Sequence, residues 1–188
     1  MINQIGKPII DTSFEIYYED KFSTTSFSKY SGKWLVLLFY PADFTFVCPT
    51  ELSEAASFYS QFKQLNAEII SVSTDTVFVH KAWHDNSKAI ATIQYPMASD
   101  KNGTLCKMFG TYIEEDGLSL RGTFIIDPEG KLISSDVHSN DIGRSTEEIL
   151  RKLQAAIYVR EHYGEVCPAS WKPGNSTLKP GVDLVGKI

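Results

Sequence analysis

The longest apolar run in the sequence extends from Trp34 to Tyr40, between Lys33 and Pro41. An apolar run this short, without polar alternation, is typical of a β-strand that is buried on both faces. Pro41 ends the strand because proline cannot donate to a hydrogen-bond ladder. The run is also far shorter than the ~20 apolar residues that a membrane helix needs. The chain is therefore expected to build a sheet that is covered on both sides.

The segments after this strand alternate between helical and strand patterns. Pro49 suits the first turn of a helix, and apolar residues recur at helical spacing up to Leu65. Ser145 and Glu148 have the spacing of a capping box at the start of a later helix. In order, the patterns predict a helix at 49–65, a strand at 68–74, a helix at 76–87, a short element at 95–98, a brief helix at 105–109, a hairpin of 123–126 with 131–137, and a long helix from 145.

This order of elements predicts an α/β fold with a central mixed sheet flanked by helices. A length of 188 residues fits a single domain. We assign residues 1–166 to that domain and residues 167–188 to an extended C-terminal arm. The arm is set apart by its composition, because its 22 residues include three prolines and three glycines.

The charge balance and the N-terminus exclude several classes of function and location. The net charge is −5 and no run of Lys or Arg is present, so neither nucleic acid nor an anionic membrane surface is an expected partner. The first residues include no apolar segment of the kind that secretory signals contain. We therefore expect a cytoplasmic location, where cysteines are more often catalytic than structural.

The chain has three cysteines, Cys48, Cys106 and Cys167, and an odd number excludes a closed framework of intrachain disulfides. Cys48 falls at the start of the predicted helix, where free N–H groups and the helix dipole stabilise a thiolate, the nucleophilic form of cysteine. Thr45, three residues earlier, is close enough to direct its hydroxyl at the same pocket. On position alone, a cysteine that simply packs as a small apolar residue is an equally good interpretation.

A wider set of motifs decides between these two interpretations. The most informative stretch is Phe44-Thr45-Phe46-Val47-Cys48-Pro49-Thr50-Glu51, preceded by Pro41. Further segments are Ser73-Thr74-Asp75, His80-Lys81-Ala82-Trp83, the run from Leu120 to Asp127, Gly143-Arg144-Ser145, and Gly164-Glu165-Val166-Cys167-Pro168-Ala169. Together, and in this order, they resemble the typical two-cysteine peroxiredoxins over nearly the whole chain. The ending from Asp183 to Ile188 is similar to that of the bacterial alkyl hydroperoxide reductase branch of the family.

The resemblance implies a thioredoxin-like fold and a thiol peroxidase that reduces hydrogen peroxide and organic hydroperoxides. Cys48 would be the peroxidatic cysteine, which attacks a peroxide oxygen and becomes a sulfenic acid. Thr45 would hydrogen-bond the peroxide, and Arg121 would stabilise the thiolate and polarise the leaving oxygen. Without the resemblance, we would interpret Arg121 as an ordinary surface arginine. Pro41 would shield the sulfur from water.

Two further residues and a second cysteine follow from the same resemblance. Glu51 would orient an arginine through its carboxylate, and Arg144 would be a second arginine near the pocket. Cys167 would be the resolving cysteine and would form a disulfide with Cys48 of the partner chain, so that catalysis requires a homodimer. Cys106 has no family motif around it and reads as a partly buried free thiol, with a contact between dimers or a modification site as the alternatives.

The implied partners are a peroxide substrate, a flavoprotein disulfide reductase that draws on NADH, and further copies of the chain, as a homodimer that assembles into a decamer. Thioredoxin is the alternative reductant. No cofactor is expected. Although His80 and His84 stand four residues apart, the pattern of a zinc protease does not follow, so no metal is expected either.

Two other functions remain as alternatives. A thioredoxin-type disulfide oxidoreductase is disfavoured because Pro49-Thr50-Glu51 follows Cys48, and not the second cysteine of a Cys-x-x-Cys motif. A ring-forming holdase chaperone or scaffold could coexist with catalysis. The net role expected from the leading interpretation is antioxidant defence and redox homeostasis.

Overall fold

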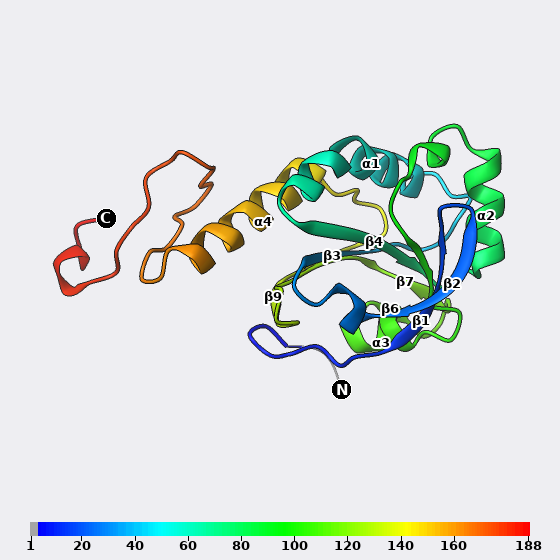
Figure 1. Ribbon diagram of the computed structural model, residues 1–188, viewed down its shortest axis with the longest axis horizontal. Helices are drawn as coiled ribbons and strands as arrows, with labels where there is room; N and C mark the ends of the chain where they lie inside the picture. Colours follow the sequence, from blue (N-terminus) through cyan, green and yellow to red (C-terminus); the bar gives the residue numbers. More distant parts are fainter. Residues whose placement is uncertain (1–3) are drawn as a thin grey trace. The chain divides into compact units, whose positions relative to one another are not determined.

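The computed structural model describes residues 4–188 and divides into two compact units, one up to Thr146 and one from Glu147 to Ile188 (Figure 1). The first unit is built on a seven-stranded mixed sheet. Its strands, in spatial order, are β2 (Lys21–Ser26), β1 (Ser13–Tyr18), β5 (Met97–Ser99), β4 (Ala67–Ser73), β3 (Trp34–Phe39), β8 (Arg121–Ile126) and β9 (Leu132–His138).

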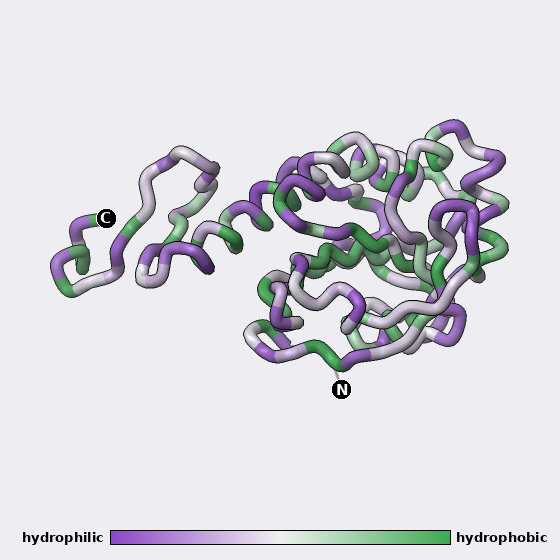
Figure 2. Tube along the Cα trace, in the orientation of Figure 1, coloured by the Kyte–Doolittle hydropathy of each residue, from purple (hydrophilic) through white to green (hydrophobic). Residues whose placement is uncertain are grey.

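The longest apolar run of the sequence forms the central strand β3, and all six residues of this strand are buried. It pairs parallel with β4 and antiparallel with β8, so Leu37 lies opposite both Ile70 and Phe124. Figure 2 shows the most apolar part of the chain in these central strands. The predicted buried strand and the predicted mixed sheet are confirmed.

Helices cover the sheet from both sides, as the sequence predicted. Figure 1 shows α1 (Cys48–Gln64) on one side and α3 (Thr104–Phe109) on the other. Phe109 of α3 packs against the rings of Phe39 and Phe124, with centroids 5.2 and 4.7 Å apart. The remaining elements of this unit are α2 (Val77–Asn86), the small hairpin β6 (Tyr112–Ile113) and β7 (Leu118–Ser119), and the 3₁₀ turns η1 (Phe27–Tyr30) and η2 (Ile90–Thr92).

The hairpin of β1 and β2 has no counterpart in the sequence prediction. Two residues, Glu19 and Asp20, connect its strands, and both have positive φ, at 49° and 56°. Turns of this kind favour Asn-Gly, because glycine and asparagine adopt positive φ most easily. Glu-Asp gives no such signal, so the sequence pattern indicates no turn here.

The second unit contains α4 (Thr146–Glu161) and the C-terminal segment, which includes the 3₁₀ turn η3 (Val182–Leu184). The C-terminal segment folds back on itself, since Val166 pairs with Leu178 in an antiparallel bridge. Arg151 of α4 donates to the Trp171 carbonyl at 3.0 Å, and the Tyr158 and Trp171 rings are 4.9 Å apart. The division of the chain between residues 166 and 167 stays a prediction.

Within residues 4–188, no helix is long and apolar enough to span a bilayer. Over the same residues, His, Cys, Asp and Glu side chains form no group of three or more that could hold a metal ion. His80 and His84, the pair considered for a metal, contact the Ala98 and Ile93 carbonyls through their Nε2 atoms.

Cys106 is a residue of α3 and belongs to the apolar core, where its side chain is completely buried. Its N–H donates to Asp100 Oδ2 at 2.7 Å, and the same carboxylate accepts from Leu105. Burial, together with the negative charge of Asp100, raises the pKa of the Cys106 thiol to about 12. The structure therefore makes Cys106 more buried than the partly buried thiol that the sequence suggested.

We expect Cys106 to resist alkylation by iodoacetamide in the folded protein, even at about pH 9, where a free cysteine is largely thiolate. Deprotonation requires a pH near the raised pKa, so the reaction stays slow below it. Peptide mass spectrometry after alkylation with and without urea measures this directly. Equal labelling of Cys106 in both samples would contradict the burial of its thiol.

Candidate active site

The loop between β3 and α1 carries Cys48 to the first position of α1, as the sequence predicted. Its sulfur is completely buried. Pro49 occupies the next position, where its missing N–H costs no hydrogen bond. The helix start thus presents the thiol at the positive end of the α1 dipole.

A buried network holds this loop in place. The Tyr40 hydroxyl donates to Asp43 Oδ1 at 2.6 Å, and His80 Nδ1 lies 2.7 Å from Asp43 Oδ2. The Asp43 N–H donates to Asp75 Oδ2 at 2.8 Å. Phe44, which follows Asp43 in the loop, has a positive φ of 55°. This conformation costs energy and persists only where the surroundings enforce it.

Arg121 is the first residue of β8, and its guanidinium reaches the Cys48 sulfur. Arg121 Nη1 donates to Cys48 Sγ at 3.3 Å and to Glu51 Oε2 at 2.7 Å. Arg121 Nε donates to the Asn140 carbonyl at 2.9 Å. The side chain is almost fully buried, so the interpretation of Arg121 as an ordinary surface arginine is wrong.

Arg144 completes the cluster from the segment between β9 and α4. Its backbone N–H and its Nε both donate to Glu51 Oε1 at 2.9 Å, and its Nη2 donates to Glu51 Oε2 at 3.0 Å. Arg144 Nη1 also donates to the Gly122 carbonyl at 2.9 Å. Glu51 therefore receives hydrogen bonds from both arginines and fixes the position of each.

The charged groups beside the Cys48 sulfur carry a net positive charge. Burial acts to raise the pKa of Glu51, but hydrogen bonds from Arg144 and the charges of both arginines outweigh it, so the pKa lies below its usual value. Two arginines and one carboxylate leave one uncompensated positive charge in a buried place. A Cys48 thiolate would neutralise that charge, at a distance where a charge-assisted hydrogen bond is strong.

Two other predicted residues lie in the same loop. Pro41 is buried at its beginning. The Thr45 hydroxyl donates to the Ala42 carbonyl at 2.8 Å, which uses its proton and leaves the oxygen lone pairs available. An incoming O–H group could therefore donate to Thr45.

Cys167 belongs to the second unit, where it is partly exposed. Its sulfur lies 3.9 Å from the Ala155 carbonyl of α4. Burial and the nearby Glu165 carboxylate raise the pKa of Cys167, although the positive charge of Arg151 acts in the opposite direction.

The network of Tyr40, Asp43 and Asp75 around the loop could not be predicted from the sequence pattern. By sequence, His80 belongs to a family-like segment and is a possible metal ligand, whereas in the structure its ring pairs with the buried carboxylate of Asp43. The one available signal was that Asp43 lies immediately before the most informative motif. The Asn140 carbonyl, a main-chain group, could not be found from residue types at all.

We expect Glu51→Gln to destabilise the protein by about 3–5 kcal/mol, because it leaves two buried arginines without their carboxylate. The pKa of Glu51 is lowered in the folded state, so this stabilisation is complete above the usual value of 4.5 and is lost as the pH falls through the lowered value. Urea unfolding of both proteins at a series of pH values measures the difference. The exposed Glu115→Gln is the matched control, and an equal effect of both changes would contradict the role given to Glu51.

The chain is similar to known proteins along most of its length. Residues 5–135 match the model of the AhpC/TSA family, and residues 157–187 match the C-terminal domain of 1-Cys peroxiredoxin. The chain is 48% identical to alkyl hydroperoxide reductase C of Staphylococcus saprophyticus, over 98% of each chain. It is 46% identical to the protein of that name from Salmonella typhimurium, over 100% of this chain and 99% of that one.

Solved structures give the same result. AhpC of Enterococcus faecalis superimposes with a TM-score of 0.86 at 42% identity, over 89% of this chain and 100% of that one. The reduced 2-Cys peroxiredoxin of Plasmodium vivax gives a TM-score of 0.91 at 32% identity, over 95% and 94%. The predicted thioredoxin-like fold is therefore confirmed. A chain so similar along its whole length, with a buried cysteine beside an arginine at a helix start, belongs to the AhpC/TSA family of peroxiredoxins, which are thiol-dependent peroxidases.

Proposed function

We propose that Cys48 is the peroxidatic cysteine of this chain and that it reduces hydrogen peroxide and organic hydroperoxides. The observation that carries the proposal is the contact between Arg121 Nη1 and the buried Cys48 sulfur at 3.3 Å. A fixed guanidinium beside a thiol favours the thiolate and also offers a donor to an oxygen that becomes negative.

In the proposed step, the Cys48 thiolate attacks one oxygen of the peroxide. An S–O bond forms, the O–O bond breaks, and the leaving oxygen departs with the electron pair and takes a proton to become an alcohol or water. The sulfur loses two electrons and becomes a sulfenic acid. Arg121 donates to the developing negative charge, and Thr45 accepts a hydrogen bond from the peroxide O–H through its free lone pairs.

The remaining residues act by position. Glu51 holds Arg121 and Arg144 through the hydrogen bonds that they donate to its two oxygens. Pro41 is buried at the start of the loop, where an apolar ring keeps water away from the sulfur. Because these groups are already in place, the transition state needs little reorganisation around it.

The sulfenic acid is then proposed to condense with Cys167 of the partner chain. The Cys167 thiol attacks the Cys48 sulfur, an intersubunit disulfide forms, and one water leaves. The Cys48 side chain is fully buried, so the first turn of α1 must open before the two sulfurs can approach. Cys167 itself is partly exposed and free.

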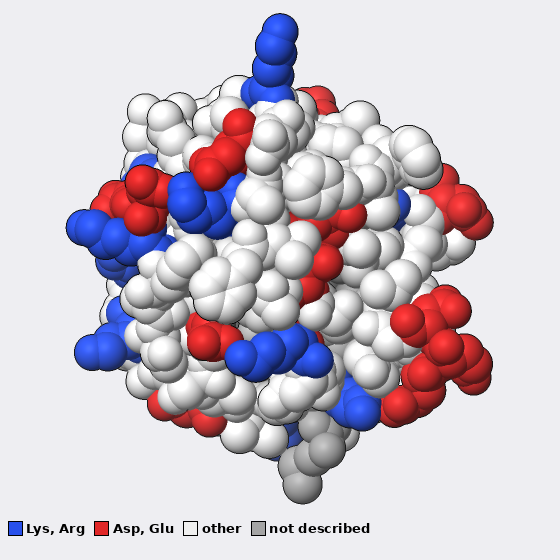
Figure 3. Space-filling view, turned by 90° about the vertical axis from the view of Figure 1, so that its right-hand side faces the viewer, with Lys and Arg blue, Asp and Glu red and all other residues white. Residues whose placement is uncertain are grey.

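The family implies oligomeric assembly and a reductase partner, and we propose a homodimer that assembles into a decamer. Two features support contacts between copies. β9 is an edge strand with exposed Ile133 and Val137, and an unpaired edge is a template for strand pairing. Phe44 and Phe78 are exposed as well, and uncharged side chains make up much of the face on the α2 side, between acidic and basic ones (Figure 3).

We propose a flavoprotein disulfide reductase that draws on NADH as the electron donor, with thioredoxin as the alternative. Its thiols would reduce the disulfide and restore both cysteines. A cytoplasmic location and a part in antioxidant defence and redox homeostasis complete the proposal. Reconstituted turnover with each reductant distinguishes the two donors.

We expect Cys48→Ser to abolish peroxide consumption, because serine supplies no comparable nucleophile. Cys106→Ser, which changes a thiol outside the cluster, should keep the activity if it folds, and circular dichroism checks the folding of both variants. The rate of peroxide loss with excess dithiothreitol is the measurement. Equal rates for wild type and Cys48→Ser would overturn the assignment and leave a holdase or scaffold as the better function.

We expect Cys167→Ser to remove the disulfide-linked dimer that peroxide generates in the wild type. The variant should still form the sulfenic acid at Cys48, which dimedone traps. A non-reducing gel and mass spectrometry of the dimedone adduct give the two readouts. A disulfide-linked dimer that persists in Cys167→Ser would assign the resolving role to Cys106 instead.

A further inference from the structure

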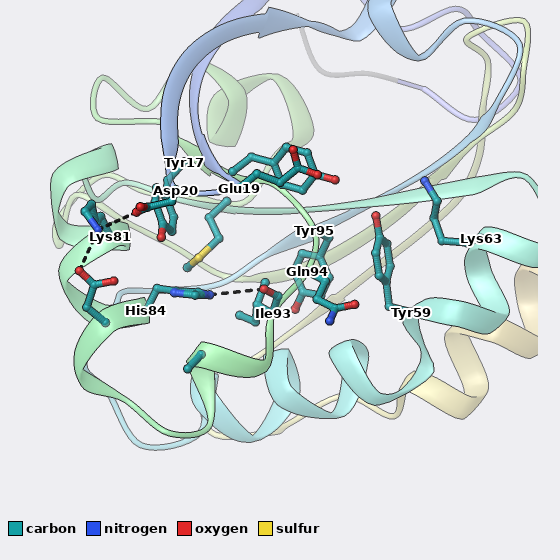
Figure 4. Close-up of a pocket in the computed structure, with 14 residues that line it drawn as sticks. Tyr17, Glu19, Asp20, Tyr59, Lys63, Lys81, His84, Ile93, Gln94 and Tyr95 are labelled. Carbon is teal, nitrogen blue, oxygen red and sulfur yellow. Dashed lines mark hydrogen bonds and ion pairs between the residues drawn. The ribbon is translucent and has the colours of Figure 1, made fainter.

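The first unit contains a pocket that the peroxidase site does not use. It lies between the β1–β2 hairpin, the end of α1, the helix α2 and the segment from Ala91 to Met97, and its volume is about 710 Å³ (Figure 4). Pockets of this size bind small molecules in many proteins. None of the residues that line it belongs to the cluster around Cys48.

Aromatic side chains form much of its wall. Tyr17, Tyr18, Tyr59 and Tyr95 all line the pocket, and Ile93 adds apolar surface. Figure 4 shows Tyr59 and Tyr95 on one side and Tyr17 on the opposite side, so that a guest between them would have rings around it. Aromatic faces carry partial negative charge and attract cations.

Two lysines of the chain already occupy ring faces at the two ends of the pocket. Lys81 Nζ lies 5.8 Å from the centre of the Tyr17 ring, and Lys63 Nζ lies 5.6 Å from that of Tyr59. Each is paired with carboxylates. Lys63 contacts Glu68 at 2.9 Å, while Lys81 contacts both Asp20 at 2.8 Å and Asp85 at 2.9 Å.

The charges of this region do not balance. Lys63 with Glu68 is neutral, but Lys81 with its two carboxylates leaves one negative charge. Glu19, which also lines the pocket, adds a second. Apart from His84, the charged groups named here thus leave two uncompensated negative charges beside the aromatic rings.

The two acidic residues at the rim sit in an unfavourable backbone conformation. Glu19 and Asp20 form the hairpin turn at positive φ, where glycine or asparagine would be more stable. A local conflict between sequence and structure often marks a functional position. Here the conflict places two carboxylates at the mouth of the pocket, where Asn-Gly would place none.

We propose that this pocket binds a small organic cation, a primary amine or guanidinium carried on an aromatic or branched apolar body. The charged end would lie near Glu19 and the ring faces, and the body would cover Ile93 and the tyrosines. An anionic ligand of the same shape would meet the excess negative charge and be rejected. The inference is independent of the proposed role of Cys48.

Two probes of the same size test the sign of the charge. Tyramine carries an amine on a phenol, and 3-(4-hydroxyphenyl)propionate carries a carboxylate on the same ring. Saturation-transfer difference NMR suits a large assembly, and isothermal titration calorimetry gives the affinity. We expect saturable binding of tyramine that weakens with salt, and no binding of the propionate. Equal binding of both probes, or no saturable binding of tyramine, would overturn the proposal.

Two substitutions inside the pocket should act in opposite directions. Glu19→Gln removes a carboxylate and should weaken tyramine binding about two- to fivefold, the range of an exposed ion pair. Lys81→Met removes a competing ammonium from the Tyr17 face and should strengthen binding. Glu115→Gln, which lies outside the pocket, is the matched control and should leave the affinity unchanged. Equal effects of Glu19→Gln and Glu115→Gln on the affinity for tyramine would contradict the proposal. A general structural disturbance would not weaken binding in Glu19→Gln and strengthen it in Lys81→Met.

Discussion

The carboxylate of Glu51 is the group on which the candidate active site depends. It lies on α1, three residues after Cys48, and accepts hydrogen bonds from Arg121 of β8 and Arg144 of the segment after β9. One side chain therefore connects the start of α1, the strand β8 and the segment after β9. Arg121 Nη1 contacts both this carboxylate and the Cys48 sulfur, so the place of the guanidinium relative to the sulfur is set by Glu51.

Burial of these charged groups costs free energy, and it also strengthens the electrostatic attractions between them. Charges removed from water lose hydration, and the loss is offset only where every charged group has partners. Glu51 achieves this with bonds to both of its oxygens, and Arg121 uses the Asn140 carbonyl as well. The low dielectric that makes ionisation expensive also strengthens the attraction between the remaining positive charge and a thiolate at Cys48. The apolar core around β3 supplies that environment.

The sequence predicted the elements that a local pattern determines. It missed the contacts that form only when distant segments of the chain pair with each other. β3 and α1 were predictable because a short apolar run and a helical periodicity are each contained in one segment. The meeting of Arg121 with Cys48 follows instead from the register of β8 on β3, which sets Gly122 opposite Phe39. No local pattern encodes that register, so only the family resemblance placed Arg121 at the site. The β1–β2 hairpin was missed because its turn consists of Glu19 and Asp20.

The same ion cluster decides which part of α1 can move. A disulfide with another chain requires the Cys48 sulfur to leave its buried position, so α1 must unwind at its start. Glu51 is anchored to two arginines, and from that residue onward the helix is also fixed by the core contacts of Leu52 and Phe62. Before Glu51, the N–H and the hydroxyl of Thr50 both donate to the Val47 carbonyl, within the same turn. In the proposed disulfide step, this anchor would confine unwinding to the one turn that holds Cys48, and the arginines would stay in place for the next catalytic cycle.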